Sequence, residues 1–312
     1  MQVSHSLKMM GTQIDIQIDS PGAREQIVKV CQLLDIYNQR FSANDERSEL
    51  MALNRNAGVK SLTVHPELFE LIALGKKHSV ASPSNLNIAL GPLVDLWHIG
   101  FSDARKPSAA EIEARLPLTS PEKILLNREK QSVFLTEKGM KIDLGALAKG
   151  YIADKIITYL AEDGINSALI NLGGNVLVHG QNSRRSDGSW HIGIQNPKQP
   201  RGNNLGIVTI KNKSVVTSGI YERHLKIGEN DYHHIFDRRT GYPIETDMAS
   251  LTIIASQSVD CEIWTTRLFG LPLIEVLQTI NETSHIEGLA VTKDNRIFLS
   301  SGLKNQFQPL YR

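Results

Sequence analysis

Hydrophobic residues change their spacing within residues 140–160 of the chain. The apolar residues of Met140–Leu144 alternate with polar ones, which predicts the end of a β-strand. From Ala146 the apolar positions repeat at helical spacing, and Gly164 is placed to end that helix. A helix that starts beyond a strand presents free N–H groups and the positive end of its dipole, which suits a phosphate. Lys149 would add a positive charge there, although an ordinary junction with a solvent-facing lysine fits the same pattern.

The rest of the chain alternates between strand and helix patterns. Strict alternation over Gln13–Asp19 predicts a half-buried strand, and Ser108 with Glu111 forms a capping box. Strands come in runs and hairpins with helices between blocks, which favours an α+β fold over a doubly wound parallel sheet. We expect a single domain over residues 1–312, with two lobes that divide near residue 120 around a cleft. Further helices are expected at 22–39, 48–54, 66–79, 108–116, 259–271 and 273–280, and further strands at 61–64, 123–126, 132–136, 167–171, 176–179, 190–195, 205–210, 214–218, 224–227, 232–236, 249–255, 288–292 and 297–298.

Composition narrows the functional class. The 312 residues are 41% hydrophobic and 21% charged, as in globular proteins, and a net charge of +1 favours neither nucleic-acid binding nor a polybasic membrane anchor. No apolar run approaches the ~20 residues that cross a bilayer. The first residues lack an export signal, and Cys31 and Cys261 make no disulfide framework. These features predict a cytoplasmic protein.

The segment Ser258–Phe269 carries a candidate metal site. Glu262 and Thr266 are four residues apart, so they share one face near the start of a helix. A carboxylate, a hydroxyl and main-chain oxygens are hard ligands suited to Mg²⁺. Asp260 is a second carboxylate at the entry to the helix. The alternative is a capping carboxylate with a threonine that bonds back to its own helix.

Two further segments hold polar groups on strands. His233 and His234 are neighbours, so they face opposite sides of a strand, and one of them should point into a cleft. A histidine there could act as acid, base or hydrogen-bond donor, or it could simply be a satisfied structural residue. The glycines of Asn171–Asn175 permit close backbone approach or a hairpin turn. The sequence contains no Walker loop, dinucleotide fingerprint, Cys-x-x-Cys pair or Gly-x-Ser-x-Gly nucleophile elbow.

Seven segments of the chain follow one another in a fixed order: Met10-Gly-Thr, Ser84–Leu93, Ile142–Tyr151, Asn171–Asn175, Thr217-Ser-Gly, His234–Pro243 and Glu262–Phe269. Taken together, they resemble the ApbE family, the FAD:protein FMN transferases. The resemblance runs from about residue 8 to residue 300. It implies an ApbE-like fold and a Mg²⁺-dependent transfer of FMN from FAD to a Thr or Ser hydroxyl of a target flavoprotein, with release of AMP.

The resemblance also implies roles for individual residues. Glu262 and Thr266 would be metal ligands, together with main-chain oxygens near Ile152 and Thr265, and Asp260 could assist. His234 and Lys149 would act in catalysis, with Lys149 at the diphosphate. Family members usually carry Asp where Glu262 stands and Pro where Arg238 stands, and they often carry Ala-Phe-Asp in place of residues 85–87. The positions expected to contact FAD are Met10, Ser42, Asn85, Leu86, Asn87, Lys149, Lys155 and His234.

Two other functions remain open at this point. The same site could hydrolyse FAD to FMN and AMP with water as the acceptor. The departures from the family pattern would also suit a flavin-binding protein without catalytic activity. Many family members are exported and lipid-anchored, whereas this chain shows no lipobox and so resembles a cytoplasmic member.

Overall fold

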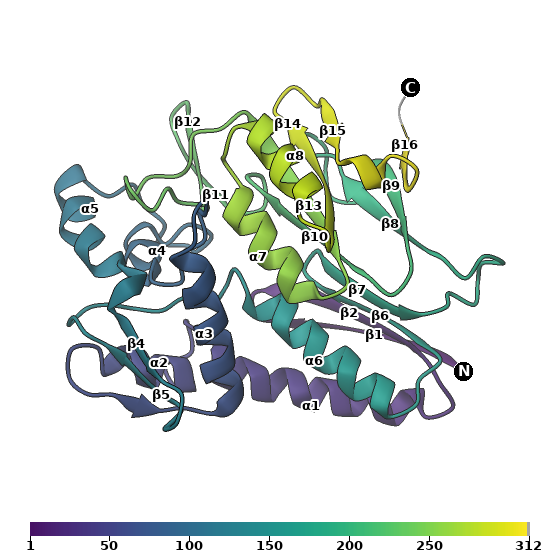
Figure 1. Cartoon of the computed structure of the whole chain (residues 1–312), viewed down its shortest axis with the longest axis horizontal. Helices are drawn as coiled ribbons and strands as arrows, with labels where there is room; N and C mark the ends of the chain where they lie inside the picture. The colour runs from purple at the N-terminus through teal and green to yellow at the C-terminus, as the bar shows by residue number, and fades with distance from the viewer. Residues whose placement is uncertain (311–312) are drawn as a thin grey trace.

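The computed structural model describes residues 1–310, which fold into helices and antiparallel sheets as the α+β prediction requires (Figure 1). Within this part of the chain the largest sheet has eight strands in the order β1-β2-β6-β7-β10-β13-β14-β15, and every neighbouring pair is antiparallel. The strands are β1 (Gln2–Met9), β2 (Thr12–Asp19), β6 (Ser167–Leu172), β7 (Asn175–Gly180), β10 (Ser214–Gly219), β13 (Met248–Ala255), β14 (Ile286–Thr292) and β15 (Ile297–Leu299).

Both faces of this sheet are covered, because its strands send alternate apolar side chains to each side. In β6, Ile170 joins the core beneath the helices, whereas Leu169 packs into the core on the opposite face. Four helices lie along the first face (Figure 1): α1 (Ala23–Phe41), α6 (Ala148–Glu162), α7 (Ser258–Leu268) and α8 (Leu273–Glu282). The opposite face is covered by a small sheet of β8 (Trp190–Gln195), β9 (Asn204–Ile210) and β16 (Phe307–Pro309).

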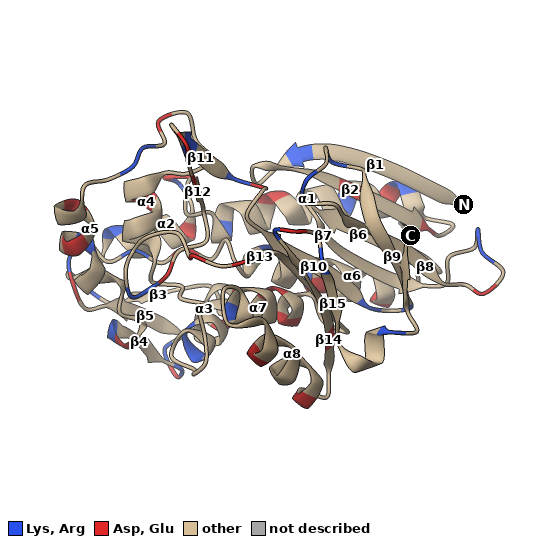
Figure 2. Ribbon diagram, turned by 90° about the horizontal axis from the view of Figure 1, so that it is seen from above, with Lys and Arg blue, Asp and Glu red and all other residues tan. Residues whose placement is uncertain are grey.

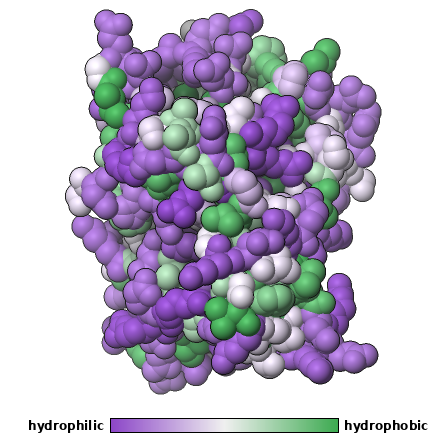
Figure 3. Space-filling view, turned by 90° about the vertical axis from the view of Figure 1, so that its left-hand side faces the viewer, coloured by the Kyte–Doolittle hydropathy of each residue, from purple (hydrophilic) through white to green (hydrophobic). Residues whose placement is uncertain are grey.

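The remaining elements form the left-hand part of the molecule in Figure 1. Strands of a small sheet, short helices and a separate hairpin make up this part, and Trp97 lies at the centre of one of its apolar clusters. The face that it turns outward is mostly hydrophilic, with hydrophobic residues scattered among polar ones (Figure 3). Its elements are α2 (Glu49–Arg55), β3 (Leu62–Thr63), α3 (Pro66–Ser79), α4 (Gly91–Trp97), α5 (Ala109–Arg115), η1 (Leu116–Thr119), η2 (Pro121–Lys123), β4 (Ile124–Asn127), β5 (Ser132–Leu135), β11 (His224–Ile227) and β12 (Asn230–His233), and η3 (Ser301–Leu303) lies elsewhere, near the C-terminus.

Strand pairing does not follow the expected division near residue 120. β2 pairs with β6 in the large sheet, and β5 pairs with β3 in the small one, so both parts draw on chain from each side of that boundary. The two parts are therefore built from interleaved segments of the chain. That the whole chain forms a single domain stays a prediction. None of the helices in the described part combines the length and apolar character that a membrane span requires.

The expected strand end over Met140–Leu144 is wrong. The segment is extended, but it joins no sheet, because its backbone is held by a side chain and a loop instead of a neighbouring strand. The amide of Asn54 accepts from the N–H of Ile142 at 2.8 Å and donates to its carbonyl at 2.9 Å. The N–H of Asp143 donates to the carbonyl of Ile88 at 2.9 Å. The helix that follows begins at Ala148, two residues after the predicted start.

Candidate active site

The first turns of α6 and α7 touch each other through a glycine. A Cβ at Gly150 would lie 2.6 Å from the carbonyl oxygen of Ser258 and 2.7 Å from the Cα of Val259. Only a residue without a side chain permits this backbone contact. The two helix starts that the sequence singled out therefore lie side by side, and they bring the side chains of Lys149 and Glu262 together.

Glu262 is a buried carboxylate with one free oxygen. It is 4% exposed. Its Oε1 accepts from the Asn175 amide at 2.9 Å and lies 3.5 Å from the Nζ of Lys149. Its Oε2 is buried and has no hydrogen-bond partner within residues 1–310. A buried carboxylate oxygen without a donor is costly unless a cation or another donor approaches it, so this atom can still bind a cation or a donor.

The other predicted metal ligands differ in how well they are placed. The sequence left open whether a threonine hydroxyl bonds back to its own helix. Thr265 does so, because its hydroxyl donates to the carbonyl of Glu262 at 3.0 Å. In the described part of the chain the hydroxyl of Thr266 makes no such bond and shares the helix face of Glu262. The carbonyl of Thr265 accepts from Phe269 at 3.0 Å and retains a second lone pair. Ile152 lies in the second turn of α6.

Asp260 does not join this group. It precedes Glu262 by two helical positions, about 200° around the axis, and the charges that act on it are those of His285 and Lys77. Burial raises its pKa. No cluster of three or more His, Cys, Asp or Glu side chains that could hold a metal occurs in residues 1–310. A cation here would therefore rely on one carboxylate plus neutral oxygens, a donor set that Mg²⁺ tolerates because it retains waters.

A main-chain carbonyl holds His234 in a defined orientation. Its Nδ1 lies 3.1 Å from the carbonyl oxygen of Arg223, and the backbone N–H of His234 donates to that oxygen at 3.3 Å. Burial lowers the pKa of His234 to about 4, and the charges of Arg223 and Lys149 contribute to the shift. His233 faces the other side, where its Nε2 contacts the carbonyl oxygen of Ile244 at 2.9 Å. Of the two histidines, His234 is the one whose environment includes Lys149.

Met10 lies in the turn between β1 and β2, next to a glycine that adjoins the Arg223 side chain. It adopts a φ of 53°, and a Cβ at the next residue, Gly11, would lie 3.5 Å from the Arg223 guanidinium. A Cβ at Gly100 would lie 3.0 Å from the Arg223 side chain. The Arg223 side chain thus bridges the β1–β2 turn and the loop after α4, with His234 bonded to its carbonyl.

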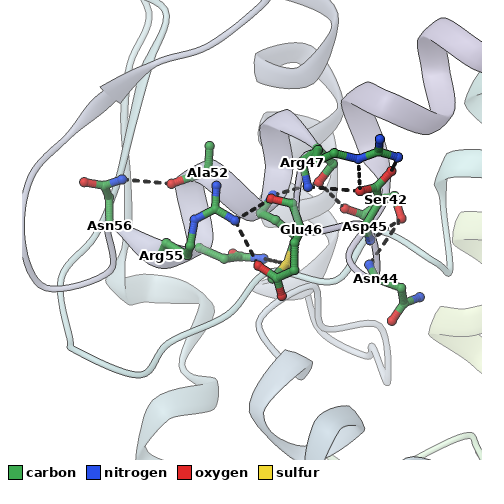
Figure 4. A network of polar contacts seen from close by, with 11 residues as sticks. Ser42, Asn44, Asp45, Glu46, Arg47, Ala52, Arg55 and Asn56 are labelled. Carbon is green, nitrogen blue, oxygen red and sulfur yellow. Dashed lines mark hydrogen bonds and ion pairs between the residues drawn. The ribbon is translucent and has the colours of Figure 1, made fainter.

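Ser42 and Lys155 occupy other surroundings. Ser42 follows α1, and its hydroxyl accepts from the N–H groups of Asn44 and Asp45 at 3.2 and 3.1 Å (Figure 4). The Nζ of Lys155 lies 3.2 Å from the Glu70 carboxylate and 4.8 Å from the centre of the Tyr151 ring. Six helical positions separate Lys155 from Lys149, so the two lysines leave α6 in different directions. The structure does not bring Ser42 or Lys155 together with Glu262.

The segment Asn85–Asn87 runs beside the C-terminal end of α7. Asn85 donates from its backbone to the carbonyl of Arg267 at 2.9 Å and from its side chain to that of Phe269 at 2.6 Å. Asn87 donates to the carbonyl of Thr119 at 2.8 Å. Leu86 is 1% exposed and its side chain belongs to the core, so its contact with FAD stays a prediction that only its backbone could meet. A pocket of about 690 Å³ adjoins Asn85, but neither Lys149 nor Glu262 lines it.

Sequence reasoning did not single out two residues that shape the site. Asn175 orients Glu262 and accepts from the Ser258 hydroxyl at 2.5 Å. Asp154 caps α7 from α6, because its carboxylate accepts from the N–H groups of Ser258 and Val259 at 2.7 and 2.8 Å. Burial raises the pKa of Asp154 to about 6 although these two hydrogen bonds lower it. Both residues stand in segments that the sequence had marked, but their partners lie about 90 to 100 residues away.

The comparison with known proteins decides the family. The sequence profile of the ApbE family matches residues 10–290. The chain belongs to the ApbE family. A relative from Klebsiella pneumoniae (strain 342), named FAD:protein FMN transferase, is 40% identical over 307 residues, which are 98% of this chain and 94% of the relative. A Treponema pallidum (strain Nichols) protein of the same name is 32% identical over 90% of this chain and 81% of its own length.

Solved structures agree with this assignment. The crystal structure of the ApbE protein from Thermotoga maritima matches with a TM-score of 0.90 at 26% identity, over 98% of this chain and 99% of that one. The flavin transferase ApbE from Vibrio cholerae matches with a TM-score of 0.83 at 24% identity, over 98% and 99% of the two chains, which shows the fold alone. The predicted family, the α+β fold class and the transferase activity are confirmed.

Proposed function

We propose that this ApbE-family chain transfers FMN from FAD to a Thr or Ser hydroxyl of a target flavoprotein at the site formed by Lys149, His234 and Glu262. The acceptor oxygen would form a bond to the phosphorus of the FMN half, the bond to the AMP oxygen would break, and the acceptor proton would pass to the protein. The observation that carries the proposal is the buried Oε2 of Glu262, which has no hydrogen-bond partner among residues 1–310 and lies on the carboxylate beside Lys149 at the start of α6. Phosphoryl transfer depends mainly on positioning and charge neutralisation, which these groups supply.

Mg²⁺ fits the oxygen atoms that surround Glu262. The residues that would hold it are Glu262 and Thr266 through their side chains, and Ile152 and Thr265 through main-chain oxygens. When bound, the ion would neutralise charge on the diphosphate and act as a Lewis acid. Oε2 supports this assignment, because within residues 1–310 it has no hydrogen-bond partner, although Lys149 and Asn175 approach the other oxygen of the same carboxylate.

His234 is suited to accept the proton of the acceptor hydroxyl. A main-chain carbonyl can only accept a hydrogen bond, so the contact of Nδ1 with the carbonyl of Arg223 places the ring proton on Nδ1. The neutral ring then carries its lone pair on Nε2. Because the pKa of His234 is lowered to about 4, the ring is neutral at pH 7 and its lone pair is free to accept a proton, as a weaker base than an unperturbed histidine.

Lys149 is suited to bind the diphosphate. It lies in the first turn of α6, where the helix dipole favours an anion. Its Nζ donates to the carbonyl of Gly145 at 3.2 Å and is about one-third exposed, so the ammonium has a donor left for a ligand. Its proximity to Glu262 would bring the phosphates and the cation together.

The test is a transfer assay with FAD, Mg²⁺ and candidate acceptor flavoproteins. We expect the acceptor mass to increase by one FMN and AMP to appear in equal amount. AMP released equally fast without any acceptor would favour hydrolysis of FAD by water. FAD binding without AMP release under any condition would favour a flavin-binding protein without catalytic activity.

A further inference from the structure

The hairpin of β11 and β12 stands apart from the other sheets. Within residues 1–310 these two strands pair only with each other. The hairpin projects from the molecule in both Figure 1 and Figure 2, and charged residues mark its tip. Arg223 directly precedes β11 and His234 directly follows β12. The hairpin therefore connects an open strand edge to the proposed general base.

The backbone of β11 has unpaired hydrogen-bonding groups on its outer edge. The N–H of His234 donates to the carbonyl of Arg223, so these two residues form a hydrogen-bonded pair of the ladder. Bonded and non-bonded pairs alternate in an antiparallel ladder. His224 opposite His233 and Lys226 opposite Asp231 are therefore non-bonded pairs. The N–H and C=O groups of His224 and Lys226 point away from β12, and no hydrogen bond to them from elsewhere in residues 1–310 is formed.

We infer that the outer edge of β11 receives the acceptor segment of the target flavoprotein as an added β-strand. This inference rests on the proposed function, which requires a Thr or Ser hydroxyl beside His234. An exposed strand edge binds extended peptides through main-chain hydrogen bonds, and here the bonds would be made by His224 and Lys226.

The geometry brings such a strand toward the histidine ring. Arg223 and His234 form one cross-strand pair, so their side chains leave the hairpin on the same face. The His234 ring lies against the Arg223 carbonyl and thus leans across the ladder toward β11. Strands are spaced about 5 Å apart, so a residue of the added strand opposite Arg223 would lie about 10 Å from the Cα of His234. A Thr or Ser at that place, on the same face, would direct its hydroxyl toward Nε2.

A transient substrate suits this edge better than a second copy of the chain. β11 has four residues, and three of them, His224, Lys226 and Ile227, are exposed. The side chains of His224 and Asp231 pair with each other at 3.0 Å instead of forming an apolar surface. A stable interface buries roughly 1,200–2,000 Å² in total, which a four-residue strand cannot provide alone. Main-chain pairing that lasts for one reaction cycle needs much less buried surface.

The decisive variants are Lys226→Pro and Lys226→Ala. Proline removes the outward N–H of residue 226, and an edge strand tolerates proline. Alanine keeps this N–H and removes the charged side chain. The acceptor is the flavoprotein domain that the wild-type chain labels in the transfer assay. Lys226→Pro should lower kcat/KM for that domain about tenfold, the loss expected for one or two main-chain hydrogen bonds. Lys226→Ala should stay near wild type, and both should keep the wild-type affinity for FAD.

Equal labelling of the acceptor by Lys226→Pro and wild type would overturn the inference while leaving the transferase activity intact. If Lys226→Pro loses the hairpin, as a fall in melting temperature or FAD affinity would show, amide hydrogen exchange on the wild type decides instead. Saturating acceptor should slow exchange at His224 and Lys226, and unchanged exchange would contradict the inference. A shift to a dimer that depends on residue 226 would assign the edge to a second copy of this chain.

Discussion

The carboxylate of Glu262 lies 3.5 Å from the ammonium of Lys149, at the contact between the first turns of α6 and α7. The pair is asymmetric, since Glu262 is 4% exposed whereas the Lys149 side chain is 31% exposed. Lys149 and Asn175 both approach Oε1, and Oε2 is left without a partner within residues 1–310. The buried carboxylate is thus oriented from one side and open on the other, as a ligand awaiting a cation would be.

Glu262→Gln should remove the affinity for Mg²⁺ while preserving side-chain size. We expect Mg²⁺ binding in the presence of FAD, measured by calorimetry, to weaken at least about tenfold, and transfer to fall by about 100-fold. Asp260→Asn is the matched control, because Asp260 lies on another face of the same helix near Lys77 and His285. A loss of Mg²⁺ affinity in Asp260→Asn as large as that in Glu262→Gln would contradict the assignment.

The pH dependence of transfer should reflect the lowered pKa of His234. Its base form is neutral, and burial lowers the pKa to about 4, so the ring protonates only as the pH falls through that value. An unperturbed histidine would lose its base form near pH 6.5. We therefore expect His234 to cause no decline in kcat/KM between pH 7 and pH 5, measured with a stopped assay and with circular dichroism to confirm folding at each pH. Asp154, whose pKa is raised to about 6, is the other group that titrates in this range.

A decline in wild-type kcat/KM centred near pH 6.5 would contradict this prediction if it persisted in Asp154→Asn, which removes the other group that titrates there. His234→Asn retains a hydrogen-bond donor for the Arg223 carbonyl but has no basic nitrogen. It should therefore keep the hairpin and the FAD affinity while losing the transfer rate. That combination separates a role in proton transfer from a role in holding the loop.

Much of the fold could be predicted because its signals are local. The capping box of Ser108 and Glu111 is present as predicted, with the N–H of Glu111 donating to the Ser108 hydroxyl at 3.3 Å. The predicted helix from Pro66 to Ser79 has the predicted bounds, with His65 as its cap. These features depend on residues within one helical turn of each other. The first strand, Gln2–Met9, was missed because this edge strand is largely exposed and has little apolar alternation to detect.

The candidate site was predictable only in part. The spacing of Glu262 and Thr266 placed them on one helix face, and that depends on local geometry alone. Asn175 and Arg223 reach Glu262 and His234 through tertiary contacts that no spacing rule reveals. Asp260 was included because it was expected in the entry to the helix, whereas α7 already begins at Ser258 and so places Asp260 about 200° around the axis from Glu262.

Arg238 should stabilise the turn that follows His234. Its Nη1 donates to the carbonyl of Ser79 at the end of α3, at 2.6 Å, and so joins the turn to a helix C-terminus, where a positive charge is favourable. Arg238→Ala should lower the free energy of unfolding by about 1–2 kcal/mol and slow transfer several-fold. Urea denaturation and the transfer assay measure the two effects.

Arg238→Pro tests whether rigidity can replace that hydrogen bond. The family usually carries proline at this position, and a fixed φ would restrict the turn in another way. We expect Arg238→Pro to recover most of the transfer rate that Arg238→Ala loses. If the proline variant is slower than the alanine variant, the turn is held mainly by the contact with Ser79.

Gly150→Ala should separate the two helices that form the site. The added Cβ would lie 2.6 Å from the Ser258 carbonyl oxygen and 2.7 Å from the Val259 Cα, and neither backbone atom can rotate away. Overpacking of this kind costs about 1–3 kcal/mol, which exceeds the roughly 1 kcal/mol that alanine gains over glycine in a helix. A wider gap between α6 and α7 would also lengthen the distance from Lys149 to Glu262, so transfer should fall more than stability does.

Ala161→Gly provides the matched control, because it weakens the same helix at an exposed position far from the α7 contact. It should lower the free energy of unfolding by about 1 kcal/mol and leave the transfer rate of the folded protein near wild type. Urea denaturation gives the stability of each variant, and the transfer assay at a temperature where both are folded gives the rate. If the two variants lose transfer in the same proportion as stability, the close approach at Gly150 serves the fold and not the site.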